Sequence, residues 1–150
     1  MKKILFTMWA SMFILIGCTD QNEPREDYIG GPLKIALLSS NKQQDLKNID
    51  FEMIEDLDTL ATASKPYDGL IIAEDRLQEA DQEKYVSFYD KVTYPIFFWG
   101  TENTQGFKNN GDGSKKTWEL NLPDSPNEYS KNQGMLIQML NAIDSDKNKN

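Results

Sequence analysis

Three short apolar segments, each followed by polar or turn-forming residues, constrain the fold of this chain more than any other feature. They occupy residues 34–39, 70–73 and 94–100. A strand with one exposed face alternates apolar and polar residues, whereas a short continuous apolar run is typical of a strand covered on both faces. The three segments therefore predict the buried centre of a sheet, with Pro95 confined to the start of its strand.

The segments between these strands are compatible with helices and with one further strand. Residues 43–49 have room for one or two helical turns, and residues 56–63 predict a helix that stops before Lys65-Pro66. Residues 51–54 alternate weakly and predict a strand. Residues 77–92 predict a longer helix, because from Tyr85 onward their apolar side chains step by three, one and three. Within this segment we expect Asp81 to cap the main helix, with Gln82 and Glu83 in its first turn.

A hairpin is predicted in the last third of the chain. Asn110-Gly111 and Asp112-Gly113 are strong turn signals, so we expect the hairpin between Phe107 and Trp118. Residues 118–122 alternate as a half-exposed edge strand would.

A closing helix is predicted after the hairpin. Residues 125–128 read SPNE, which combines a capping box with a proline at the first helical position. From Asp144 onward the chain is polar, and we expect it to fray. The apolar face of this helix is expected at Tyr129, Leu136, Leu140 and Ile143.

Alternation of strands and helices, with continuous apolar strands, implies an α/β fold whose parallel sheet is covered on both faces. The layout resembles a small doubly wound domain with a mostly parallel sheet of about five strands, either flavodoxin-like or response-regulator-like. A chain of 150 residues has room for one domain, which we place at residues 33–144, with a disordered tail at 145–150. This resemblance is one of fold and carries no function by itself.

The response-regulator resemblance does not extend to the phosphorylation site. Such domains carry an acidic pair after the first strand, where this chain has SSN at residues 39–41. They carry a lysine after the last strand, where this chain has Leu122-Pro123. Thr101 matches the pattern and Asp75 matches it loosely, but without the acidic pair and the lysine we expect no phosphoryl transfer.

The N-terminus has the pattern of an export signal. Lys2 and Lys3 precede an apolar run at residues 4–16, which is shorter than the roughly 20 residues needed to span a bilayer. The next residues, LIGC at 15–18, resemble the lipobox of bacterial lipoproteins. The resemblance implies a signal peptide at residues 1–17, cleavage after Gly17 and a diacylglyceryl group on the Cys18 thiol. A plain secretory signal with a chance cysteine and an uncleaved membrane anchor are the alternatives.

A lipid on Cys18 would make the membrane a partner of the chain. Residues 18–32 would then form a flexible tether, of which residues 19–32 reach at most about 46 Å. We expect the domain on the extracytoplasmic face of the cell membrane. In a Gram-negative cell we expect the outer membrane, because Thr19 rather than Asp follows the cysteine.

Composition excludes several classes of function. The net charge is -8, and loss of Lys2 and Lys3 with the signal peptide would change it to -10, which argues against nucleic acid as a partner. The chain has no histidine, so Ser-His-Asp and Cys-His catalysis and imidazole metal sites are excluded. Its one cysteine rules out an intrachain disulfide. We expect no cofactor, because neither G-x-G-x-x-G nor a P-loop occurs.

Candidate ligand-binding residues follow the strands. In doubly wound folds, ligands bind at the carboxyl ends of the strands. Here those ends carry residues 39–41 and three carboxylates, Glu74, Asp75 and Glu102. Carboxylates with hydroxyls and an amide suit Mg²⁺ or Ca²⁺, or an acid and base pair. The alternative is that Glu74 and Asp75 only begin the next helix, where acidic residues suit the helix dipole.

Two other segments are candidate sites. Residues 108–119 have part of the spacing of a calcium loop, but Lys108 stands where Asp is required, so a turn is the better interpretation. Among the aromatic side chains, Trp118 is the better candidate for an interface, because its strand is expected at an edge of the sheet.

Two hypotheses of function remain open. The first is a non-catalytic lipoprotein that binds a partner protein of the cell envelope or modulates an envelope process. The second is a small ligand- or cation-binding α/β domain that uses Glu74, Asp75 and Glu102, with or without hydrolysis of the ligand.

Overall fold

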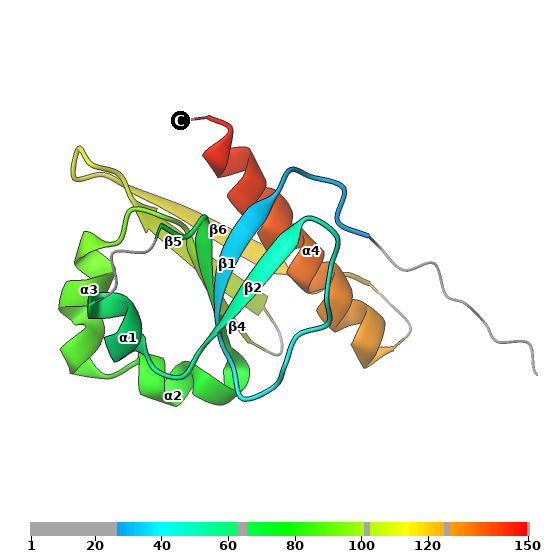
Figure 1. Cartoon of the computed structure of the whole chain (residues 1–150), viewed down its shortest axis with the longest axis horizontal. Helices are drawn as coiled ribbons and strands as arrows, with labels where there is room; N and C mark the ends of the chain where they lie inside the picture. Colours follow the sequence, from blue (N-terminus) through cyan, green and yellow to red (C-terminus); the bar gives the residue numbers. More distant parts are fainter. Residues whose placement is uncertain (1–26, 63–65, 101–102, 125–126, 150) are drawn as a thin grey trace, which may run out of the picture.

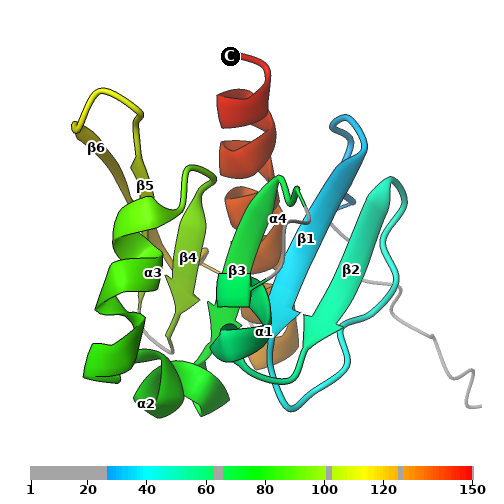
Figure 2. The same cartoon turned by 60° about the vertical axis from the view of Figure 1, so that its left-hand side comes forward.

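A six-stranded sheet forms the centre of the domain, in a computed structural model that describes residues 27–62, 66–100, 103–124 and 127–149 (Figure 1). Helices lie on both faces of this sheet, as the two views together show (Figure 2). The strands are β1 (Leu33–Leu38), β2 (Ile49–Ile54), β3 (Gly69–Ala73), β4 (Ile96–Trp99), β5 (Asn103–Asn109) and β6 (Lys115–Asn121). The helices are α1 (Leu57–Thr62), α2 (Leu77–Ala80), α3 (Val86–Lys91) and α4 (Glu128–Lys147), with 3₁₀ turns η1 (Glu74–Arg76) and η2 (Glu83–Tyr85).

The strand order is β2-β1-β3-β4-β5-β6. Neighbours from β2 to β4 are parallel, whereas β5 is antiparallel to both β4 and β6. The α/β class is therefore confirmed, but the expectation of a mostly parallel sheet of about five strands is incomplete. The antiparallel β4–β5 pair follows the short connection between Trp99 and Asn103, whereas the sixth strand and the β5–β6 pair come from the hairpin turn. Gly113 has a φ of 84° in this turn, a left-handed conformation that favours glycine.

Each face of the sheet carries its own apolar cluster. On one face α4 packs over β1, β3 and β4, and its buried members are Met135, Leu136, Ile137, Met139, Leu140 and Ile143. On the other face, α1, α2 and α3 cover the alternate residues of the same strands, including Leu38, Ile72 and Ile96. The central strands are thus buried on both sides, which explains their continuous apolar sequence.

Two expected helices are absent or broken. Residues 43–49 do not form a helix: they run as a loop into β2, and the Asn48 carbonyl accepts a hydrogen bond from the N–H of Leu33 at 2.9 Å. The helix expected at 77–92 is interrupted after Ala80, and Gln82 is extended at φ -71°, ψ 137°. The Tyr89 hydroxyl donates to the Ala80 carbonyl at 2.8 Å. This oxygen thus accepts from a side chain instead of from a backbone N–H of a continuing helix. Asp81 therefore caps no long helix.

The folded body extends further at both ends than expected. Tyr28, placed in the tether, is only 4% exposed and joins the cluster under α4. The tail expected to fray instead continues α4 to Lys147, because Asp146 is buried and paired with two lysines. Among the described residues, no helix has the length and apolar character that crossing a membrane requires.

Candidate functional site

A cavity of about 500 Å³ opens at the carboxyl ends of β1, β3 and β4. We call it the carboxyl-edge pocket. The loop at residues 39–48 and the first turns of α4 complete its walls. Its volume falls in the range of about 300–1,000 Å³ that is usual for small-molecule sites.

The topology of the sheet explains why the pocket lies here. After β1 the chain crosses to β2 on the α4 face, where Leu46 packs against the apolar cluster. After β3 the chain leaves on the opposite face through η1, α2 and α3. Because the two connections diverge, β1 and β3 form a topological switch point, where doubly wound sheets leave a crevice for ligands.

The lining of the pocket combines an apolar floor with a polar rim. The floor is made by buried or half-buried side chains: Leu37, Leu46, Ala73, Trp99, Leu122 and Leu136. The rim carries five side-chain amides, those of Asn41, Gln43, Gln44, Asn132 and Gln133. It also carries charged groups of both signs: Lys42, Glu74, Asp75, Glu128 and Lys131. An apolar floor combined with polar side chains that can fix the orientation of a ligand is usual for a ligand site.

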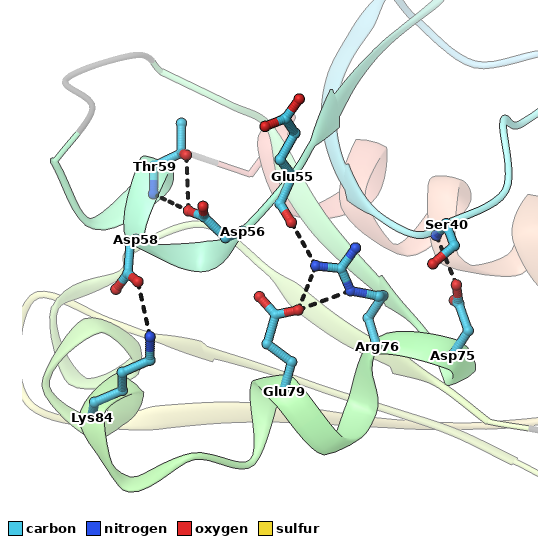
Figure 3. A network of polar contacts seen from close by, with 9 residues as sticks. All are labelled: Ser40, Glu55, Asp56, Asp58, Thr59, Asp75, Arg76, Glu79 and Lys84. Carbon is cyan, nitrogen blue, oxygen red and sulfur yellow. Dashed lines mark hydrogen bonds and ion pairs between the residues drawn. The ribbon is translucent and has the colours of Figure 1, made fainter.

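Asp75 ties the two strands together across the switch point. Its Oδ2 accepts a hydrogen bond from the backbone N–H of Ser40 at 2.7 Å (Figure 3). Loss of solvent around the carboxyl raises its pKa, but the hydrogen bonds from the side chain and backbone of Ser40 outweigh this effect. The pKa of Asp75 therefore lies below its usual value, and the group is ionised at neutral pH.

The neighbouring residues of η1 form a separate polar network. The Arg76 guanidinium donates to the Glu79 carboxylate and to the Glu55 carbonyl oxygen, which connects η1 to the end of β2 (Figure 3). These contacts fix the turn that carries Glu74 and Asp75. Both acidic residues do lie in the first turn after β3, as the helix-start interpretation expects, and both also line the pocket.

A hydrogen bond between α4 and the 39–48 loop crosses the pocket rim. The Tyr129 hydroxyl donates to Gln44 Oε1 at 2.9 Å. Tyr129 is 59% exposed, so its expected place in the helix core is wrong. The helix also begins later than expected: Asn127 is its N-cap and accepts from the N–H of Ser130 at 2.8 Å, while residues 125–126 lie outside the described part.

Trp118 lies on the edge strand β6, where it was expected. Its ring is half-buried, with its centroid 5.5 Å from that of Phe97, and the Lys116 ammonium stands 4.5 Å from its centroid. Part of the indole therefore belongs to the apolar cluster under α4. Its use as an interface residue stays a prediction.

Two of the predicted site residues meet at the pocket and two cannot be placed. Glu74 and Asp75 both line it, whereas Glu102 and Cys18 lie outside the described residues. Within the described ranges, no group of three acidic or sulfur side chains is arranged to hold a metal ion. The cation site with Glu102 stays a prediction.

Sequence reasoning missed the residues that α4 and Trp99 contribute to the pocket. Trp99 belongs to the segment 94–100, which predicts the buried centre of the sheet, although its position as the last residue of β4 is a signal for the carboxyl edge. Comparison with protein-family models, curated proteins and solved structures gives no match for this chain.

Proposed function

We propose that this chain is a bacterial lipoprotein whose α/β domain binds a small ligand in the carboxyl-edge pocket without catalysing a reaction. The observation that carries the binding role is the position of the pocket. It lies at the switch point between β1 and β3, and it has a polar rim above an apolar floor of buried and half-buried side chains. Of the two functions that the sequence leaves open, the pocket favours ligand binding. We combine it with the non-catalytic lipoprotein of the other hypothesis.

The membrane anchor is supported by the sequence LIGC at residues 15–18 behind a basic and apolar leader. Acylation would also use the one thiol of the chain, which would otherwise be reactive in an oxidising compartment. Each buried methylene contributes about 0.8 kcal/mol to membrane binding, so a diacylglyceryl group holds more firmly than a single acyl chain. We place the domain on the extracytoplasmic face of the cell membrane.

The non-catalytic character is supported by the chemistry of the pocket rim. Without histidine, acid–base chemistry near neutral pH would need a carboxyl group or a lysine with a shifted pKa. Asp75 has the opposite property, because its hydrogen bonds with Ser40 keep it ionised. The Ser39 hydroxyl oxygen accepts from the N–H of Asn41 at 3.0 Å, a local turn contact rather than a contact with a general base.

The pocket would face away from the bilayer. The chain enters the domain at the amino ends of the strands, where Lys147 Nζ donates to the Pro32 carbonyl at 3.0 Å and Asn48 donates to the Gly30 carbonyl at 3.2 Å. These contacts hold the end of the tether at that edge. A strand of the length of β1 spans about 20 Å, so the pocket lies at the opposite pole of the domain.

We also propose that the domain is a variant of the flavodoxin-like layout. The parallel strands follow the order β2-β1-β3-β4, which matches the first four positions of the 2-1-3-4-5 order of that fold. The departures are the loop in place of a first helix and the antiparallel β5 and β6. The resemblance supports the place of the ligand site and carries no activity.

Metabolic labelling tests the anchor. Cells grown with radioactive palmitate should label the wild-type protein in the membrane fraction, and Cys18→Ala should remove both the label and the membrane association. An unlabelled wild-type protein that keeps its leader would overturn the lipoprotein proposal.

Thermal melting tests the alternative that the pocket holds a divalent cation through its carboxylates. A specific ion should raise the melting temperature of the wild-type protein in Ca²⁺ or Mg²⁺, and Asp75→Ala should abolish the rise. We expect neither ion to change the melting temperature, because Asp75 already accepts hydrogen bonds from Ser40.

A further inference from the structure

We propose that the ligand of the carboxyl-edge pocket is a neutral mono- or disaccharide. This inference rests on the proposed binding function of the pocket and adds the class of ligand. It is carried by three properties of the lining: the abundance of side-chain amides, the tryptophan in the floor and the balance of charges.

The rim is suited to hydroxyl groups. A side-chain amide has both donors and acceptors, and so does each hydroxyl of a sugar. Five amides surround the pocket, from the 39–48 loop on one side and from α4 on the other. A ligand with hydroxyls around its whole edge can therefore bond to both walls at once, which a ligand with one polar end cannot do.

The floor is suited to the face of a sugar ring. Trp99, the last residue of β4, is half-buried beside Leu122 and Leu136. The face of an indole is the negative region of its quadrupole, and the axial C–H groups of a pyranose carry partial positive charge. An apolar floor with polar walls thus complements a flat ring with an apolar face and a polar edge.

The charges of the rim disfavour an ionic ligand. The rim carries two cations, Lys42 and Lys131, and three carboxylates, Glu74, Asp75 and Glu128, so neither a phosphate nor an ammonium meets charge of one sign. The domain as a whole is acidic, which disfavours the approach of an anion. The carboxylates of the rim can still accept hydrogen bonds from hydroxyls, and its lysines can donate to them. Such hydrogen bonds are stronger than those between neutral groups.

The test is a titration of the mature acylated protein, purified from membranes in a polyoxyethylene detergent because maltoside headgroups are themselves saccharides. Glucose, galactose, N-acetylglucosamine, cellobiose, maltose and N,N′-diacetylchitobiose are titrated by calorimetry. Inorganic phosphate, glutamate and CaCl₂ are the charged probes. Tryptophan emission is recorded in parallel. Trp9 leaves with the signal peptide, and of the other two tryptophans Trp99 lies in the pocket and Trp118 lies outside its lining.

The matched variants are Asn132→Ala and Asn141→Ala, which remove exposed amides from the same helix, one at the pocket and one away from it. We expect at least one neutral saccharide to bind, with affinity lowered about tenfold by the first variant and unchanged by the second. The change in emission on binding should persist in Trp118→Phe and be lost in Trp99→Leu. Asn132→Ala is on the surface, so it tests the proposal even where Trp99→Leu fails to fold.

The other outcomes overturn the inference in distinguishable ways. Binding of a charged probe without binding of any saccharide contradicts the saccharide proposal but still supports the pocket as a binding site. Equal affinity in the two asparagine variants, without a response of Trp99, places the sugar elsewhere and also removes the inference. A chain that binds none of the probes contradicts both the saccharide class and the proposed function.

Discussion

Lys108 Nζ and Asp146 Oδ2 lie 2.6 Å apart, and their side chains are only 11% and 8% exposed. The lysine is on β5 and the aspartate is in the last turns of α4. The other carboxylate oxygen of Asp146 accepts from Lys116 Nζ of β6 at 2.7 Å. One carboxylate therefore joins both strands of the hairpin to the end of the C-terminal helix. Solvent loss raises the pKa of Asp146, but the two lysines outweigh this and lower it.

Asp146→Ala is expected to reduce the free energy of unfolding by about 3 kcal/mol, because it leaves the Lys108 ammonium buried without its partner. Replacing both partners, as in Lys108→Met with Asp146→Leu, should restore most of the loss, since apolar side chains of similar size need no partner. Chemical denaturation of the three proteins measures the difference.

The Lys84–Asp58 pair provides the control. Its atoms are 2.8 Å apart, nearly as close, but its side chains are 51% and 63% exposed (Figure 3). Asp58→Asn should therefore have little effect on the free energy of unfolding. An equal loss in both variants would mean that burial does not determine the strength of these pairs.

The parts of the fold with local signals could be predicted from the sequence. The continuous apolar runs located β1, β3 and β4, and two adjacent turn dipeptides located the β5–β6 hairpin. The cap expected at Asp81 lies beside the observed break, and the actual N-cap is the next residue, Gln82. The contact that ends the first helix, from the Tyr89 hydroxyl to the Ala80 carbonyl, could not be predicted, because apolar spacing carries no information about it.

The sequence predicted the pocket residues that follow the strands but not those of α4, for a geometric reason. A helix of the length of α4 spans about 30 Å, whereas the strands below it span about 20 Å. Both ends of the helix therefore extend past the sheet. Tyr129 follows the spacing of the buried face but lies beyond the strand ends, where it lines the pocket instead of the core. At the other end, Asp146 lies where the sequence favours fraying, and its two lysine partners are far away in the chain.

Thr104→Val is expected to stabilise the protein by about 1 kcal/mol. Thr104 is fully buried on β5, and its hydroxyl has no hydrogen-bond partner within the described structure. Valine has the same shape and removes the cost of burying that hydroxyl. Thr117→Val, at an exposed position of the adjacent strand, should change stability by less than about 0.5 kcal/mol. A lower melting temperature for Thr104→Val would show that the hydroxyl does have a partner.

Tyr28→Phe is expected to change the alkaline stability of the domain. Burial, followed by the nearby Asp144 carboxylate, raises the pKa of Tyr28 to about 12 from an ordinary value of 10.0. Because the folded pKa is the higher one, unfolding is favoured once the phenol of the unfolded chain ionises. The stability from this group is therefore complete below pH 10.0 and is lost as pH rises toward about 12.

The measurement for Tyr28→Phe is the free energy of unfolding against pH. The variant should lose about 1 kcal/mol at neutral pH, since the hydroxyl donates to the Gly31 carbonyl at 2.9 Å, and should then decline less steeply in alkali. Burial also raises the pKa of Tyr67 and of Tyr94 to about 12, so part of the decline remains. An unchanged alkaline slope would contradict the shift assigned to Tyr28.

The proposed orientation on the membrane predicts that the pocket end of α4 is farther from the bilayer than the tether end. Asn132 lines the pocket, whereas Lys149 follows the helix end that contacts Pro32. The two residues are about 25 Å apart along the helix axis.

With Cys18 acylated, Asn132→Cys and Lys149→Cys each introduce the one reactive thiol. Energy transfer from a dye on that thiol to labelled lipid in proteoliposomes should be stronger for Lys149→Cys. The wild-type protein, taken as a control, should bind no maleimide dye. Equal transfer from both positions would mean that the tether does not hold the domain in one orientation, and stronger transfer from Asn132→Cys would place the pocket against the membrane.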